Sequence, residues 1–162
     1  MSAYTHPIRR LSPLALSNLL TATNPPSLPT DLAIIDVRDS DHIGGHIRGS
    51  LHVPSSTLSH ATPELVRKLQ DKKRVVFHCM LSQERGPNAA RKYLITRERM
   101  GLPVGVKARE GGDGEGEGEE VGQEMGQEVL VLEGGFVEWG KRFGKDVKLT
   151  EGFVAELWEG GW

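Results

Sequence analysis

The amino-acid sequence predicts an α/β fold in which helices flank both faces of a parallel sheet. Strand-like and helix-like segments alternate along the chain, and two of the strand-like segments, residues 32–37 and 74–78, are dominated by apolar side chains. A strand loses its polar face when both faces are buried, as happens in a parallel sheet covered by helices. The alternation agrees, because each parallel crossover needs a helix. Ligands of such sheets bind at the carboxyl ends of the strands.

The first half of the chain supplies one helix and two strands. Residues 12–20 form the expected helix, since Ser12 is a favoured N-cap residue. A proline-rich connector over residues 24–29 separates this helix from the apolar strand 32–37. The shorter apolar run 51–53 predicts the next strand.

The second half continues the alternation. Residues 62–69 are expected to form a helix, with Thr62 as its cap and Pro63 in the first turn, where a missing N–H costs no hydrogen bond. The remaining expected elements are strand 74–78, helix 86–94 with Pro87 in its first turn, strand 129–132, and a helix that follows Gly134 and Gly135 and runs through Trp139 and Phe143.

Length and composition indicate one domain over residues 1–162. A chain of 162 residues can bury one sizeable core. No apolar run approaches the roughly 20 residues of a membrane span, and residues 1–7 lack the basic-then-apolar pattern of a secretion signal. The single cysteine excludes an internal disulfide. We therefore expect a cytoplasmic or nuclear protein with no membrane association and no nucleic-acid partner.

The acidic charge is concentrated in one segment. Residues 110–128 contain eight of the 22 acidic residues, seven glycines and no Lys or Arg. The rest of the chain then has 14 acidic against 20 basic residues, a net charge of +6. A segment of this composition cannot form a core, so we expect residues 106–128 to be a disordered surface loop. The basic remainder suits an anionic substrate, or is an ordinary solvated surface.

Cys79 is the candidate nucleophile. It follows the strand 74–78, and five residues separate it from Arg85. A loop of this length can curl its N–H groups around a tetrahedral oxyanion while the guanidinium clamps two oxygens. The N-terminus of helix 86–94 would add positive potential, which favours the nucleophilic thiolate. The alternative is that Cys79 is only a small apolar side chain at a strand end.

Two further segments resemble the signatures of rhodanese-like domains. Residues 35–54, with the run Ile-Asp-Val-Arg-Asp and the later Gly-Gly-His-Ile, resemble the amino-terminal signature of that superfamily. Residues 132–139 resemble its carboxyl-terminal Gly-Gly-x-x-x-Trp signature. The resemblance covers about residues 12–145, which would be the core, and implies a rhodanese-like α/β fold with a five-stranded parallel sheet flanked by helices on both faces.

Within this superfamily the length of the cysteine loop separates chemistries. Sulfurtransferases have one residue fewer, whereas the longer loop here resembles the cell-division-cycle (mitotic-inducer) dual-specificity phosphatases and the fungal arsenate reductases. An apolar residue at Leu81, with Ser82, Glu84 and the Arg-Gly-Pro that begins at Arg85, favours the phosphatase branch. The chain departs from those phosphatases in lacking a second cysteine near Cys79.

The resemblance implies roles for the loop residues. Cys79 would form a phosphocysteine, Arg85 would clamp the oxyanion, and Glu84 is the candidate general acid. The oxyanion-binding loop would consist of Met80, Leu81, Ser82, Gln83, Glu84 and Arg85, with His78 and Asp36 supporting it from behind. We expect neither a cofactor nor a metal, since the spacing of His42 and His46 is better explained by the amino-terminal signature than by zinc binding.

Three functions therefore remain open. The first is a Cys-dependent protein phosphatase of the phosphotyrosine and phosphothreonine type. The second is an arsenate reductase, which would need glutathione as external reductant, with glutaredoxin as a candidate partner, since no internal thiol can attack Cys79. The third is a rhodanese sulfurtransferase or a non-catalytic binding module. The expected partner is accordingly a phosphoprotein or a small oxyanion.

Overall fold

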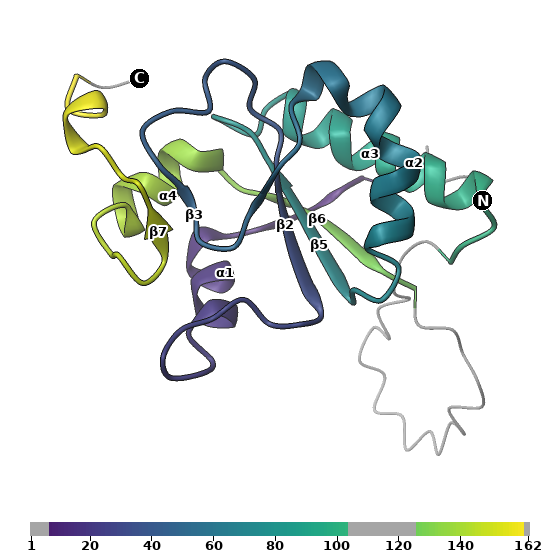
Figure 1. The fold of residues 1–162 in the computed structure, drawn as a ribbon, viewed down its shortest axis with the longest axis horizontal. Helices are drawn as coiled ribbons and strands as arrows, with labels where there is room; N and C mark the ends of the chain where they lie inside the picture. The colour runs from purple at the N-terminus through teal and green to yellow at the C-terminus, as the bar shows by residue number, and fades with distance from the viewer. Residues whose placement is uncertain (1–6, 104–125, 161–162) are drawn as a thin grey trace.

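The computed structural model describes residues 7–103 and 126–160 and contains one five-stranded sheet (Figure 1). Every neighbouring pair of strands is parallel, and the spatial order is β1-β6-β5-β2-β4. The strands are β1 (Arg9–Leu11), β2 (Leu32–Asp36), β4 (Leu51–His52), β5 (Arg74–His78) and β6 (Glu128–Leu132). The predicted α/β fold with a five-stranded parallel sheet is confirmed.

Helices cover both faces of this sheet (Figure 1). One face packs against α1 (Pro13–Leu20) and α4 (Gly135–Phe143), and the other against α2 (Leu58–Lys68) and α3 (Arg85–Arg99). A small antiparallel pair, β3 (His46–Ile47) with β7 (Thr150–Glu151), lies beside α4, and two 3-10 turns span Ser55–Thr57 and Ala155–Leu157. Within the described ranges, no helix has the length and apolar character that crossing a membrane requires.

The two central strands are buried on both faces, and alternate side chains enter different cores. Ala33 and Ile35 of β2 pack with α2 and α3, whereas Ile34 packs with α1 and α4. In β5, Phe77 packs with α2 and α3, whereas Val76 packs with α1 and α4. Helices on both faces therefore explain why these strands are apolar throughout.

The predicted start of α2 is wrong. The helix begins at Leu58, so Thr62 lies inside it and donates its hydroxyl to the Leu58 carbonyl at 2.5 Å, and Pro63 is an interior residue. The proline has no N–H to donate to the carbonyl of Ser59, an exposed residue one turn earlier. Helix α3 also extends five residues beyond the predicted 94, to Arg99.

Two other segments differ from the sequence prediction. The edge strand β1 has no sequence signal, because it is only three residues long and two of them are exposed arginines. Most of the expected loop 106–128 lies outside the described residues, but its end does not. Gln127 is buried, accepts from the Tyr93 hydroxyl at 2.6 Å and donates to two backbone carbonyls, and Glu128 begins β6. A buried, fully paired amide is part of the core.

Candidate active site

The candidate site lies where β2 and β5 end side by side. Asp36 and His78 are register partners, and the Val37 N–H donates to the His78 carbonyl at 2.9 Å. Because the strands are parallel, the segments that follow them leave from the same edge of the sheet. Cys79 is the first residue after β5 and is 3% exposed.

The loop after Cys79 curls back onto its sulfur. The backbone N–H of Ser82 donates to Cys79 Sγ at 3.2 Å, and the Ser82 hydroxyl lies 3.4 Å from the Cys79 N–H. Ser82 is fully buried and has φ +55°, a left-handed conformation that is rare for residues other than glycine. The loop therefore directs a backbone N–H donor at the Cys79 sulfur.

The start of α4 holds the first two carbonyls of this loop. The Phe136 N–H donates to the Cys79 carbonyl at 2.9 Å, and the Val137 N–H donates to the Met80 carbonyl at 3.0 Å. In a trans peptide the N–H points opposite to the C=O, so the N–H groups of Met80 and Leu81 face away from α4. These helix-terminal donors thus orient the loop peptides.

Gly135, the first residue of α4, is needed for this contact. A Cβ on Gly135 would lie 2.5 Å from the Met80 oxygen and 2.7 Å from the Cys79 oxygen, and Gly135 also has φ +59°. Any side chain would therefore push the helix away from the loop. Close approach of α4 to the Cys79 loop explains the second glycine of the pair in the carboxyl-terminal signature.

Arg85, the first residue of α3, is held by two carboxylates from the segment after β2. Its Nη1 and Nη2 donate to the two oxygens of Asp41 at 2.8 and 2.5 Å, and Nη1 also donates to Asp39 at 3.3 Å. The bonds from Arg85 are the largest influence on Asp41 and lower the pKa of its carboxyl to about 2. The same bonds raise the pKa of Arg85, to which the charge of Cys79 also contributes. The guanidinium therefore lies within Coulombic range of the sulfur.

A buried ion pair fixes the segment that carries these carboxylates. Arg38 and Asp36 are both fully buried and joined by Nε and Nη2 at 2.7–3.1 Å. Arg38 also donates to the carbonyls of Ile43 and Gly45, and its guanidinium carbon lies 4.2 Å from the centre of the Phe136 ring. Because one arginine ties both ends of the segment to the core, Asp39 and Asp41 are presented from a fixed support.

His78 is buried behind the loop. Its Nδ1 lies 3.1 Å from the Cys79 carbonyl, and its Nε2 is 3.8 Å from Asp36 with no hydrogen-bond partner in the described part of the chain. Burial lowers the pKa of His78, so the ring is neutral at pH 7. His78 therefore contacts the backbone of the loop and the buried Asp36 behind it.

Comparison with known proteins identifies the family. A model of the rhodanese-like domain matches residues 15–142. The chain belongs to the rhodanese-like family. The CDC25-like phosphatase YCH1 of Saccharomyces cerevisiae is 30% identical over 162 aligned residues, which cover 93% of this chain and 94% of that protein. A solved structure described as a yeast protein tyrosine phosphatase of the rhodanese family has a TM-score of 0.64 at 28% identity and covers 94% of this chain and 98% of its own.

Arsenate reductases are also among the relatives. Arsenate reductase 2.2 of Oryza sativa subsp. japonica is 44% identical over 64 residues, or 39% of this chain and 49% of that protein. The relatives are thus named as enzymes with two different oxyanion substrates. The comparisons support an enzyme of the rhodanese family.

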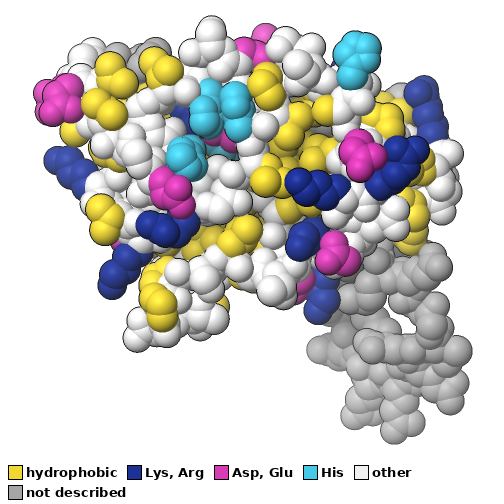
Figure 2. Space-filling model, in the orientation of Figure 1, with side chains coloured by type: hydrophobic (Ala, Val, Ile, Leu, Met, Phe, Trp, Pro, Cys, Tyr) yellow, Lys and Arg dark blue, Asp and Glu magenta, His cyan; other side chains and the backbone are white. Residues whose placement is uncertain are grey.

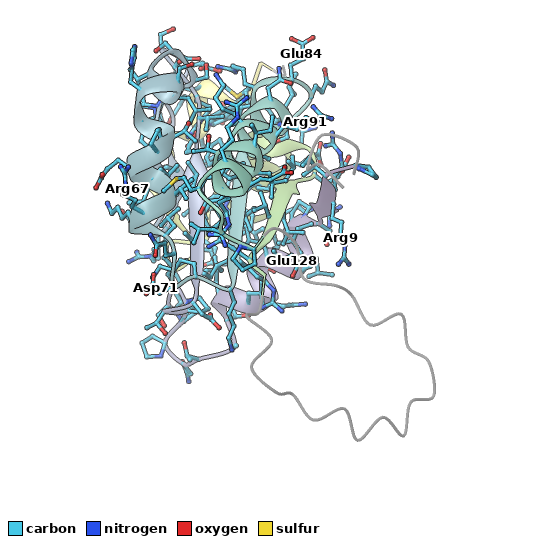
Figure 3. The ribbon with its side chains drawn as sticks, turned by 90° about the vertical axis from the view of Figure 1, so that its right-hand side faces the viewer. Arg9, Arg67, Asp71, Glu84, Arg91 and Glu128 are labelled. Carbon is cyan, nitrogen blue, oxygen red and sulfur yellow. The ribbon has the colours of Figure 1, made fainter. Side chains whose placement is uncertain are left out.

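This rhodanese-like domain brings together only some of the predicted site residues. Cys79, Ser82 and Arg85 meet at the loop, and Met80 is buried beneath it. The side chains of Leu81, Gln83 and Glu84 are exposed, so only their backbone can bind inside the loop. Figure 3 shows Glu84 projecting outward at the end of the molecule opposite Asp71, which precedes β5. The predicted acid role of Glu84 stays a prediction.

Two residues that contact the Cys79–Arg85 loop were not recognisable from the sequence. Asp41 holds Arg85, and Arg10 of β1 donates to the Ser82 carbonyl at 3.0 Å. Asp41 lies within the amino-terminal signature, but nothing in its spacing indicates a contact with a residue 44 positions away. Arg10 lies on a strand that gave no signal of its own.

The histidines near the site stack on one another. The ring centroids of His42 and His52 are 3.8 Å apart, and those of His42 and His46 are 5.9 Å apart, with both pairs stacked. Figure 2 shows histidine side chains gathered side by side on this face. Among residues 7–103 and 126–160, no group of three His, Cys, Asp or Glu side chains is arranged to hold a metal ion.

Proposed function

We propose that this rhodanese-like domain is a Cys-dependent protein phosphatase that acts on phosphotyrosine and phosphothreonine through a phosphocysteine intermediate. The observation that carries the proposal is the wrapping of the Cys79–Arg85 loop around the sulfur, with the Ser82 N–H at 3.2 Å from Sγ. The similarity to the yeast CDC25-like phosphatase over 93% of the chain supports the same reading.

The proposed reaction has two displacements at phosphorus. In the first, the Cys79 thiolate attacks in line, the S–P bond forms, and the ester P–O bond breaks as the leaving oxygen takes a proton. In the second, water attacks phosphorus, the S–P bond breaks, and phosphate leaves. The loop N–H groups and Arg85 stabilise the charge on the equatorial oxygens in both steps. The N–H groups of Met80 and Leu81, turned away from α4, suit this task.

The leaving oxygen needs a proton in the first displacement. Glu84 is the acid proposed from the sequence, and its exposed position confines it to the mouth of the loop. It would reach a leaving oxygen only on a substrate that extends out of the loop, as a phosphorylated side chain on a protein does. Leu81, which is 44% exposed on the same loop, would offer such a substrate an apolar contact.

An arsenate reductase is the second candidate, and the 44% identity to a rice arsenate reductase favours it. Cys79 would displace one arsenate oxygen as water to form an S–As bond. A glutathione thiol would then join Cys79 in a mixed disulfide, supplying the two electrons that reduce As(V) to arsenite. As Cys79 is the only cysteine, glutaredoxin and a second glutathione would have to break that disulfide.

Three parallel assays separate the candidates. Wild-type protein and Cys79→Ser would be tested for aryl-phosphate hydrolysis, glutathione-coupled arsenate reduction and thiosulfate sulfurtransfer. The phosphatase proposal expects hydrolysis that Cys79→Ser abolishes. It is wrong if the wild type hydrolyses no aryl phosphate, or if the variant hydrolyses it equally well. Arsenate reduction or sulfurtransfer without hydrolysis would support the corresponding alternative.

A further inference from the structure

The two arginines of the site use their donors differently. Arg38 has a bonding partner at all three of its nitrogens, and its Nε and Nη2 form a side-on pair with Asp36. Arg85 instead meets Asp41 end-on, through Nη1 and Nη2. Within the described ranges, no acceptor bonds Nε of Arg85.

The unused donors of Arg85 form a second bidentate edge. A guanidinium has five N–H donors. Three are used, because Nη1 reaches both Asp41 and Asp39 and Nη2 reaches Asp41. The Nε hydrogen and the second Nη2 hydrogen remain, and these two lie side by side and point the same way. Arg38 uses this same edge to bind two carboxylate oxygens, so the edge has the geometry for an oxyanion.

We propose that Asp41 is a positioning residue. It binds the end-on edge of Arg85, so that the side-on edge, Nε and Nη2, is left to bind an oxyanion at Cys79. The proposal rests on the proposed function of the Cys79 loop and adds a residue to it. Asp41 touches neither substrate nor sulfur in this role and acts only through Arg85.

The anchoring of Asp41 suits this role. Its Oδ1 also accepts from the Asp39 N–H at 2.9 Å, and Asp39 is held by the Ser55 hydroxyl and by the Ser56 N–H. The carboxylates are therefore fixed by the segment that follows β2 and by the 3-10 turn Ser55–Thr57, which precedes α2. An arginine side chain loses much conformational freedom when it binds, and holding one edge in advance reduces that loss when the oxyanion arrives.

Asp41 also places negative charge near the oxyanion, which opposes binding. The carboxyl is ionised at any ordinary assay pH, because its pKa is about 2. Replacing Asp41 removes this repulsion as well as the positioning, so a single variant mixes two effects. A double-mutant cycle with Arg85 separates them, because only the positioning requires the guanidinium.

The experiment compares wild type, Asp41→Asn, Arg85→Ala and the double variant. Two quantities are measured: kcat/KM for p-nitrophenyl phosphate, and the concentration of inorganic phosphate that protects Cys79 from iodoacetamide. With Arg85 present, Asp41→Asn should lower kcat/KM by about 10- to 100-fold and weaken protection. With Arg85→Ala, the same change should alter either quantity by less than about threefold or improve it.

Asp39→Asn is the matched control. Asp39 presents a carboxylate to the same guanidinium but reaches only one N–H, at 3.3 Å. Its coupling to Arg85 should therefore be smaller than that of Asp41. Asp41→Glu keeps the charge while moving the carboxylate, so its kcat/KM and its phosphate protection should lie between those of the wild type and Asp41→Asn. If Asp41→Asn does not fold, Asp41→Glu replaces it in the cycle.

The outcomes distinguish the two proposals. In one outcome the wild type shows no catalysis, yet phosphate protects its Cys79, and Asp41→Asn weakens this protection only when Arg85 is present. That outcome overturns the proposed function and supports the positioning role. An equal effect of Asp41→Asn in both Arg85 backgrounds overturns the positioning role alone. So does tighter phosphate binding by Asp41→Asn with Arg85 present, which would make Asp41 a competitor of the substrate. Absence of phosphate protection in the wild type overturns both.

Discussion

Gly135 lies against the carbonyl of Met80 so closely that helix α4 and the Cys79 loop form one structural unit. The N–H groups of the two residues after Gly135 donate to the first two carbonyls of the loop, and a Cβ at Gly135 would come within 2.5 Å of the Met80 oxygen. The shape of the loop therefore depends on a glycine 56 positions after Cys79 in the sequence. This contact leads to the first prediction.

Gly135→Ala should lower the free energy of unfolding by about 2–4 kcal/mol and slow alkylation of Cys79, because the added methyl group displaces the loop carbonyls. Chemical denaturation and iodoacetamide kinetics would measure the two effects. Gly152→Ala is the control, since Gly152 has a similar φ of +65° but no atom within 4 Å of its Cβ position. It should cost only about 1 kcal/mol, for backbone strain. Equal effects of the two variants would show that contact with the loop is unimportant.

Arg10→Ala should loosen the Cys79 loop at Ser82. The side chain donates to the Ser82 carbonyl, and its loss should destabilise the fold by about 1 kcal/mol and reduce kcat/KM several-fold. Arg9→Ala is the neighbouring control, because the Arg9 side chain is 69% exposed and, in the described part of the chain, forms an ion pair only with Glu128, at 3.3 Å. The interpretation would be wrong if both variants lost the same amount of activity.

Acid should weaken the contribution of the Asp41–Arg85 pair to stability. The pKa of Asp41 is lowered from 3.8 to about 2 by the bonds from Arg85, so the stabilisation is complete above about pH 4 and is lost as the pH falls toward 2. At pH 6, Asp41→Asn should cost about 1 kcal/mol after allowance for solvent screening. Urea unfolding of both proteins between pH 6 and pH 2.5 measures the difference. A difference that stays constant over this range would contradict the ion pair.

Glu84→Gln tests the predicted general acid. A phenyl leaving group needs a proton far more than a p-nitrophenyl group does, so the variant should lose about 10- to 100-fold in kcat with phenyl phosphate and little with p-nitrophenyl phosphate. Gln83→Ala changes an adjacent exposed side chain and should affect neither substrate. If Glu84→Gln treats both substrates as the wild type does, the proton comes from elsewhere.

The sequence predicted the strands best where burial is most complete. Residues 32–37 and 74–78 are apolar because helices cover both faces, so their composition reports their environment directly. Prediction failed where a local signal had two meanings. Pro63 favours a first turn by its sequence, but α2 begins five residues earlier and holds the proline in its interior. The three-residue strand β1 is too short and too polar to show a period.

The sequence by itself determined the rhodanese-like fold and the spacing of Cys79 and Arg85. Both are local properties: two signatures and a five-residue interval that one loop and one helix start can satisfy. Only the tertiary structure decided which groups surround them. Arg85 meets Asp41, 44 positions away, and Ser82 meets Arg10, 72 positions away. Such contacts arise when β2, β5 and the edge strand β1 are placed side by side with parallel carboxyl ends, and spacing along the chain carries no record of that placement.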